Sequence, residues 1–287
     1  MLPIIGIIAV IIAVIGGFLF EHGNLSVLIQ PAELVIIAGS ALGAFIISSP
    51  KKVITLVANN IILIFKTEKI DAKFYMELLM MLYELFWKTR KEGLLAIESD
   101  LANPEQSPIL QNYKDILENK LVLNFICDSM KVVSNTNLPA HKLDYLLEID
   151  IDATHHESLI PPNIISKIAD SLPGLGIVAA VLGVVLTMGK INEPPAILGG
   201  SIGAALVGTF LGVLLCYGFV SPMATNLEHQ ANEQQILLNV IRNALVAFVD
   251  GMAPQVALEA GRRAIPVKDR PPSQEIEDRI KEWKKKK

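Results

Sequence analysis

The chain of 287 residues is 52% hydrophobic and 19% charged, and its formal net charge is −4. The charges are unevenly spread, because residues 2–49 and 171–220 contain only two each. This distribution excludes a plain soluble enzyme and a protein that lies wholly within the membrane, and it predicts a membrane protein with a large water-exposed part. The net charge gives no sign of nucleic-acid binding. Two cysteines without a Cys-x-x-Cys motif argue against a disulfide framework and against a zinc site.

The sequence contains four apolar runs that are long enough to cross a bilayer. The first, Leu2–Phe20, has 19 uncharged residues and would be about 28 Å long as a helix. Because no Lys or Arg precedes it, we favour a membrane span over a cleaved signal peptide. The other runs cover residues 31–49, residues 168–188, where Pro173, Gly174 and Gly176 interrupt the pattern, and residues 196–220.

The charges of the segments between the runs predict the orientation in the membrane. Residues 50–167 hold 13 Lys and Arg and residues 221–287 hold 11, whereas the linkers 21–31 and 189–195 hold only Lys190. By the positive-inside rule, the segments rich in cations lie in the cytoplasm. The sequence therefore predicts a multi-pass protein with both termini in the cytoplasm.

The water-exposed segments have helical patterns. Apolar residues recur at helical spacing over Phe74–Ser99, and the pairs Glu84/Lys88 and Lys88/Glu92 at i,i+4 favour an exposed helix. Further helices are predicted over residues 109–133, 138–153 and 223–250, the last as an extension of the fourth span. Pro161-Pro162 is predicted to end the region before the third span, and Trp283 with the lysines after it to form a solvated tail.

The predicted fold class is an all-α membrane protein with four transmembrane helices and a large helical cytoplasmic domain. Four segments follow in chain order. Residues 1–49 hold the first two spans and a short outer loop, residues 50–167 form the cytoplasmic domain, residues 168–222 hold the third and fourth spans, and residues 223–287 form the cytoplasmic C-terminal helices and tail.

The chain lacks the residue patterns of the common catalytic and nucleotide-binding motifs, so no enzymatic activity and no cofactor or metal are expected. His155-His156-Glu157 is interpreted as a surface group, because adjacent histidines on a helix point about 100° apart. The inner lengths of the four runs lack ionisable side chains, although an ion path usually needs one. Their small residues Gly200, Ala204, Gly208 and Gly212 lie at i+4 spacing, which suits helix packing within the chain and equally a sleeve around a partner helix that brings the charge.

Segments in three of the four apolar runs resemble the MotA family of flagellar motor stator proteins. Residues 170–185, DSLPGLGIVAAVLGVV, are similar to the family's third span. Residues 207–212, VGTFLG, and 217–222, YGFVSP, are similar to its fourth span, and residues 30–39, QPAELVIIAG, to the start of its second. The resemblance covers essentially the whole chain, including the order of spans and loops.

The resemblance implies a function in bacterial flagellum-dependent motility and chemotaxis. Proteins of this family form a ring of five chains in the bacterial inner (cytoplasmic) membrane, around the single transmembrane helices of two MotB chains. The pore aspartate belongs to MotB, in keeping with the apolar spans seen here. Ion flow through this channel drives the rotor protein FliG. Lipid and these proteins are the implied partners, without nucleic acid.

The resemblance also implies roles for individual residues along the ion path. Pro173 and Pro222 match the family's functional prolines, and Tyr217 is expected either to line the pore or to act as an interfacial anchor. Sodium-driven relatives carry a threonine at the position of Ala180, whereas Thr209 is common to both classes. Because alanine offers no oxygen to replace the hydration shell of sodium, protons are the expected transported ion, ahead of sodium.

In the cytoplasmic segment, the resemblance implies that charged residues contact the rotor. The local matches KTRK at residues 88–91 and AIESD at residues 96–100 point to Arg90 and Glu98. Charged surface residues more often serve only to keep a protein soluble. Solubility is therefore the alternative explanation for Arg90 and Glu98.

Three other functions remain open at this point. An ExbB/TolQ-type energiser of outer-membrane processes would have three spans and a different order of loops. A self-sufficient channel or carrier would conduct ions without a partner, which the apolar spans disfavour. A membrane scaffold would not transport at all, and its activity would not depend on Pro173.

Overall fold

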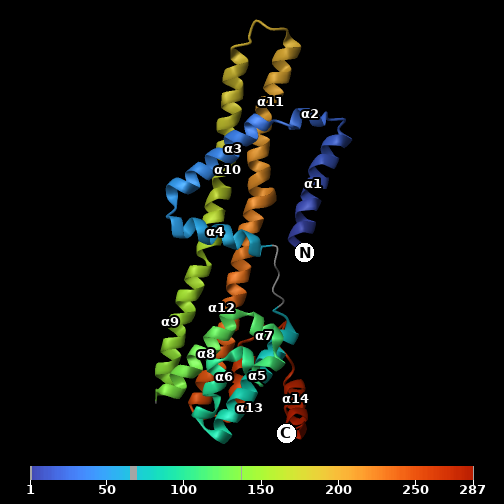
Figure 1. Cartoon of the computed structure of the whole chain (residues 1–287). Coiled ribbons are helices and arrows are strands. Elements are labelled where there is room, and N and C mark those ends of the chain that lie inside the picture. Colours follow the sequence, from blue (N-terminus) through green and yellow to red (C-terminus); the bar gives the residue numbers. More distant parts are fainter. Residues whose placement is uncertain (1, 65–69, 137, 287) are drawn as a thin grey trace. The chain divides into compact units, whose positions relative to one another are not determined.

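The computed structural model describes residues 2–64, 70–136 and 138–286, and the regular elements in these ranges are all helices (Figure 1). Four stretches are long and apolar enough to cross a membrane: Leu2–Phe20, Leu25–Ser48, Ala140–Met188 and Pro195–Val249. These stretches contain the four predicted runs, to within one residue at the end of the second, which confirms the all-α membrane fold. The helices divide into two compact units, which we call the membrane unit (Met1–Thr67 and Ser158–Gln230) and the second unit (Glu68–Glu157 and Ala231–Lys287).

The membrane unit is built around a pair of long helices. Its elements are α1 (Leu2–Phe20), α2 (Leu25–Leu28), α3 (Pro31–Ser48), α4 (Lys51–Leu63), α10 (Ile160–Met188), α11 (Pro195–Leu214), a π-helical segment η4 (Leu215–Val220) and the start of α12 (Ser221–Val249). Helix α10 packs along α11, and both α3 and α4 lie against α10. The four segments predicted from the sequence divide the chain by its course through the membrane, whereas the two units group helices that pack together. The boundaries of the segments and of the units therefore differ.

Helix α10 has prolines at its start and in its interior. The region before the third span ends at Pro161-Pro162, as predicted: α9 (Ala140–Ser158) stops just before them, and they lie in the first turn of α10, where the missing backbone N–H breaks no helical hydrogen bond. The apolar pattern is interrupted at Pro173, Gly174 and Gly176, but α10 continues as one helix through all three residues. Close packing of Leu172 and Gly176 against Gly212 of α11 supports the helix at this site.

The fourth span continues into a long helix, as predicted. It changes from α11 to the π-helical segment η4 at Leu215 and then to α12 at Ser221. Pro222 follows this segment directly. Since proline has no N–H to donate and its ring crowds the carbonyl four residues earlier, a wider turn before Pro222 relieves that crowding. The local widening therefore has an identifiable cause in the sequence.

The second unit has one hydrophobic core around α5 (Ala72–Glu92). The predicted helix Phe74–Ser99 is wrong in its C-terminal part: Gly93 adopts φ 91°, which ends α5, and the chain continues as a 3₁₀ turn η1 (Leu94–Ile97) and α6 (Glu98–Ala102). The region predicted as one helix over residues 109–133 begins with a 3₁₀ turn and a five-residue helix, and the long helix starts only at Lys120. The remaining elements are η2 (Pro104–Gln106), η3 (Leu110–Asn112), α7 (Lys114–Glu118), α8 (Lys120–Asn135), α9 (Ala140–Ser158), α13 (Pro254–Ala264) and α14 (Ser273–Lys286).

The predicted i,i+4 pairs of α5 do not form, because Glu84 is buried and Lys88 is partly buried, and both have partners outside the helix. Glu84 is 6% exposed, and its Oε1 accepts a 2.6 Å hydrogen bond from the Tyr113 hydroxyl. Lys88 Nζ instead forms an ion pair of 2.7 Å with Asp100 Oδ2, and the Ser107 hydroxyl donates to Asp100 Oδ1 at 2.6 Å. The helix is covered on most sides, and its charges find partners across the core.

The C-terminal segment is also packed, contrary to the expected solvated tail. The Trp283 ring on α14 meets the rings of Tyr83 and Trp87 on α5 edge to face, at centroid distances of 5.4 and 5.2 Å. Such pairs contribute about 0.5–1.5 kcal/mol beyond area burial. Helix α14 is therefore part of the second unit's core.

We expect Tyr113→Phe to destabilise the second unit by about 2 kcal/mol, because the buried Glu84 carboxyl would lose its hydroxyl donor. Burial and the Glu84 carboxylate raise the pKa of Tyr113, so this hydroxyl keeps its proton. The measurement is the thermal midpoint of the purified protein. Tyr145→Phe is the control, because Tyr145 is 64% exposed. Equal midpoints for the two variants would contradict the prediction.

Candidate functional site

The α10–α11 pair is held by glycines in direct backbone contact. A Cβ on Gly176 would lie 2.7 Å from Gly208 O, and a Cβ on Gly212 would lie 2.6 Å from Leu172 O. Gly208 and Gly212 thus serve helix packing within the chain. In contrast, a Cβ on Gly200, in the same i+4 series of small residues, would meet nothing within 4 Å. The surface of α11 at Gly200 is therefore open to another chain or to lipid.

Two of the predicted ion-path residues flank this crossing. Ala180 on α10 is half-buried, and its backbone N lies 3.1 Å from the position of a Cβ on Gly208. Thr209 on α11 is the next residue after Gly208 and is also half-buried. The structure therefore brings the turns that carry Ala180 and Thr209 together, and in this layer Thr209 supplies a hydroxyl while Ala180 supplies only a methyl group.

Sequence reasoning missed one buried carboxyl at the same crossing. Glu33, in the first turn of α3, is only 8% exposed. Its Oε2 lies 2.8 Å from the position of a Cβ on Gly208, and its Oε1 lies 3.4 Å from that of a Cβ on Gly183. Since an acidic residue in a first turn is normally explained by the helix dipole, the sequence pattern held no clear signal of burial.

The predicted proline of the third span lies closer to the glycine contact than to Ala180. Pro173 is a half-buried interior residue of α10, next to Leu172, whose carbonyl oxygen faces Gly212. Seven positions along a helix separate Pro173 from Ala180, which corresponds to about 10 Å. The two residues therefore belong to different levels of the same helix.

Tyr217 and Pro222 share a third location. They line a cavity of about 290 Å³ together with residues of α1, among them Leu2, Gly6 and Val10. Tyr217 is 69% exposed. The predicted ion-path residues thus fall at three places in the membrane unit: the Ala180–Thr209 layer, the Pro173 turn and the cavity at η4.

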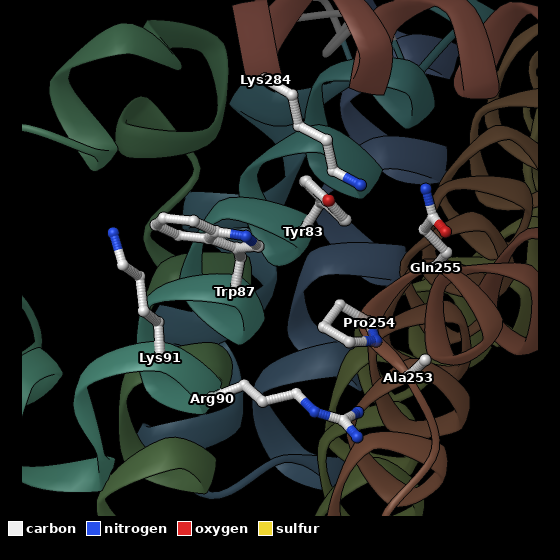
Figure 2. A pocket seen from close by; sticks show the side chains of 8 residues that line it. All are labelled: Tyr83, Trp87, Arg90, Lys91, Ala253, Pro254, Gln255 and Lys284. Atoms are coloured by element: carbon white, nitrogen blue, oxygen red, sulfur yellow. The ribbon is translucent and has the colours of Figure 1, made fainter. Parts of the chain in front are cut away.

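The two predicted rotor-contact residues are both exposed on the second unit. Arg90, in the last turn of α5, lines a pocket of about 230 Å³ with Tyr83, Trp87, Lys91, Ala253, Pro254, Gln255 and Lys284 (Figure 2). Its Nη1 donates to the carbonyl of Met252 at 3.1 Å, and Lys91 Nζ lies 4.6 Å from the centroid of the Trp87 ring. Glu98 begins α6 after the turn at Gly93. The pocket's three cations can attract acidic groups of another protein.

The comparisons with family models first define the class of protein. Residues 4–93 match the model of the motility protein A N-terminal region, and residues 116–239 match that of the MotA/TolQ/ExbB proton channel family. The second match includes the α10–α11 pair with the Ala180–Thr209 layer. The protein is thus of the class of proton-channel subunits with a membrane helix bundle.

The chain belongs to the motility protein A family. It is 38% identical to the motility protein A of Salmonella typhimurium over 98% of this chain and 95% of that protein, and equally identical, over the same shares, to that of Escherichia coli. It is 32% identical to the chemotaxis protein LafT of Vibrio parahaemolyticus over 95% of this chain and 96% of that one.

Two solved structures share the fold. A structure of C. jejuni MotAB has a TM-score of 0.79 at 19% identity and covers 93% of this chain and 96% of that one. The flagellar MotAB stator complex from Bacillus subtilis has a TM-score of 0.76 at 24% identity, with the same shares covered. The predicted family and stator role are confirmed, and the ExbB/TolQ-type alternative is not favoured.

Proposed function

We propose that this stator chain conducts protons together with a MotB-type partner and turns their flow into torque on a FliG-type rotor. In this proposal five copies surround two partner helices in the inner membrane, and both termini are cytoplasmic. The partner supplies the pore aspartate. The names of the solved MotAB structures support a MotB-type partner.

The observation that carries the proposal is the exposed apolar surface of α10 and α11. Large apolar side chains that include Ile177, Val181 and Leu206 are each more than half exposed on these helices. Such a surface needs lipid or other membrane helices as its environment. Since the exposed side chains of residues 172–188 and of α11 are apolar, a channel formed between copies requires a charged group from the partner to bind the ion.

Protons are proposed as the transported ion because of the Ala180–Thr209 layer. Sodium gives up water only where several oxygens replace it. Ala180 offers a methyl group next to the backbone of Gly208, so of these two residues only Thr209 supplies a hydroxyl. A carboxylate that binds and releases a proton does not need that oxygen shell.

The experiment is to measure swimming speed in a strain that lacks its own stators and carries this chain with its cognate partner. External sodium is varied at constant pH, and a protonophore is added in a parallel series. We expect a swimming speed that does not depend on external sodium and falls to zero with the protonophore. Speed that follows sodium would contradict the proposed ion, and failure to swim with the complex present in the membrane would contradict the motor function.

We expect Pro173→Ala to leave the complex assembled while lowering swimming speed. The proline lies in α10 beside Leu172, whose carbonyl contacts the glycine of α11, so it is placed to let the helix bend there. The measurement is swimming speed at equal amounts of membrane complex. Normal speed would contradict the role and favour a scaffold function.

We expect Arg90→Glu to reduce recruitment of fluorescently labelled stators to the motor, because the exposed cation is proposed to face acidic groups of the rotor. Proton conduction should stay unchanged. Lys73→Glu is the matched control, since this cation at the other end of α5 has a side chain that is 73% exposed. Equal recruitment of the two variants would overturn the proposed contact.

A further inference from the structure

The carboxyl of Glu33 occupies space that glycines leave free between α10 and α11. Its Oε2 and the backbone N of Ala180 lie 2.8 and 3.1 Å from one point, the position of a Cβ on Gly208. The carboxyl is therefore located at the layer of Ala180 and Thr209. Any side chain larger than hydrogen at position 208 would meet Glu33.

This carboxyl is buried and has an unsatisfied oxygen. Glu33 is 8% exposed, and its Oε2 finds no hydrogen-bond partner in the parts of the chain that the structure describes. A buried polar oxygen without a donor is unfavourable, and each such group in a protein calls for an explanation. The carboxyl is already buried in one chain, so further membrane helices would enclose it more.

The helices packed against Glu33 carry no cation near it. Helices α2, α3 and α11 contain no ionisable residue other than Glu33 itself. On α10 the ionisable residues are Lys167 and Asp170, and Asp170 precedes Gly183 by 13 positions, about 20 Å along the helix. The outer linkers add Glu21, His22, Lys190 and Glu193. A carboxylate at this place would lack an ion-pair partner on the helices packed against it, which leaves a proton as the simplest neutralising group.

We propose that Glu33 is a second proton-binding group of the ion pathway, a carboxyl of this chain that takes up and releases a proton at the level of Ala180 and Thr209. This rests on the proposed function, in which protons cross the same layer on a carboxylate of the partner. Glu33 would lie behind that layer and exchange its proton along the α10–α11 crossing. The chain would then contribute an ionisable group in addition to the apolar sleeve.

The first test asks whether Glu33 carries a proton, and it does not depend on motor activity. Membranes with the full complex are treated with dicyclohexylcarbodiimide, which attacks protonated carboxyls in apolar surroundings, and the modified peptides are identified by mass spectrometry. At pH 7 we expect Glu33 to be labelled at least about ten-fold more than the exposed Glu21, because an exposed carboxylate is almost wholly ionised at that pH. Glu33→Gln must lose the label at this peptide.

The second test asks whether that proton is transported. Glu33→Gln keeps the size of the side chain but cannot release a proton, and Glu33→Asp keeps the acid on a shorter stem. At equal amounts of membrane complex, Glu33→Gln should lower swimming speed at least about ten-fold and flatten its dependence on external pH, since loss of a proton-transfer group commonly costs 10²–10⁴-fold. Glu33→Asp should restore part of the speed with its own pH dependence.

The outcomes separate this proposal from the proposed function. Labelling of Glu33 together with a slow Glu33→Gln variant and partial recovery in Glu33→Asp supports the proposal. An unlabelled Glu33 at pH 7, or a labelled one whose glutamine variant swims normally over the whole pH range, overturns it. If the wild-type complex swims regardless of a protonophore, the proposed proton function itself fails, and a labelled Glu33 would then be a structural acid only.

Discussion

Replacement of Gly212 by valine is expected to force α10 and α11 apart and to abolish swimming. A Cβ at this position would lie 2.6 Å from Leu172 O and 2.9 Å from Gly176 Cα, and both contacts are with backbone atoms that no rotamer change can move. Overpacking of a well-packed site typically costs about 1–3 kcal/mol and occasionally more, and valine adds two methyl groups beyond the clashing Cβ. The amount of membrane-inserted complex and its swimming speed are the measurements.

Gly200→Val is the matched control on the same helix. Both glycines lie on the same face of α11, in a series of small residues spaced four apart, but a Cβ on Gly200 would meet nothing within 4 Å. The chain should therefore accumulate normally in the membrane with valine at position 200. A stable, motile Gly212→Val protein would show that the α10–α11 contact is looser than these distances indicate.

The membrane helices were predictable because their signal is long and simple. Runs of about 20 apolar residues and the asymmetry of Lys and Arg are physical requirements of the bilayer, and Leu2–Phe20 is a helix with the predicted bounds. The sequence also predicted the continuation of the fourth span beyond Pro222. It also placed a boundary at Pro161-Pro162, where α9 ends and α10 begins, but it did not show that α10 would continue through Pro173 as one helix.

The second unit was harder to predict because burial there depends on distant segments. The i,i+4 charges of α5 indicated an exposed helix, but Lys88 meets Asp100 and Glu84 meets Tyr113 from segments that local spacing cannot place. The four lysines after Trp283 indicated a solvated tail, but the Trp283 ring packs against the rings of Tyr83 and Trp87 on α5. In each case tertiary packing overrides a local pattern.

The candidate site was predicted in part. The resemblance pointed to Ala180 and Thr209, whose turns the structure brings together, and to Arg90, which lines a cationic pocket. The roles of these residues stay predictions. Glu33 was missed because the search for ionisable groups covered only the inner lengths of the spans, whereas the first turn of α3 is packed against α10 and α11.

Lys88→Met should be among the most destabilising single changes in the second unit. Asp100 is only 2% exposed, so removal of Lys88 would leave a buried carboxylate whose remaining partner is the Ser107 hydroxyl. Breaking a buried ion pair from one side costs about 3–5 kcal/mol. For a unit of this size that cost corresponds to a fall in the thermal midpoint on the order of 10 °C, which scanning calorimetry or fluorescence of the purified protein would detect.

Two further variants distinguish the buried charge from a simple loss of packing. Lys131→Met removes a pair of 3.3 Å whose side chains are 45% and 74% exposed, and it should change stability by less than about 1 kcal/mol. Adding Asp100→Asn to Lys88→Met should recover part of the lost stability, because the neutral amide no longer needs a cation and can still bond to Ser107. If the double variant is as unstable as Lys88→Met, the packing of the lysine stem would be the main contribution, and the charge argument would be wrong.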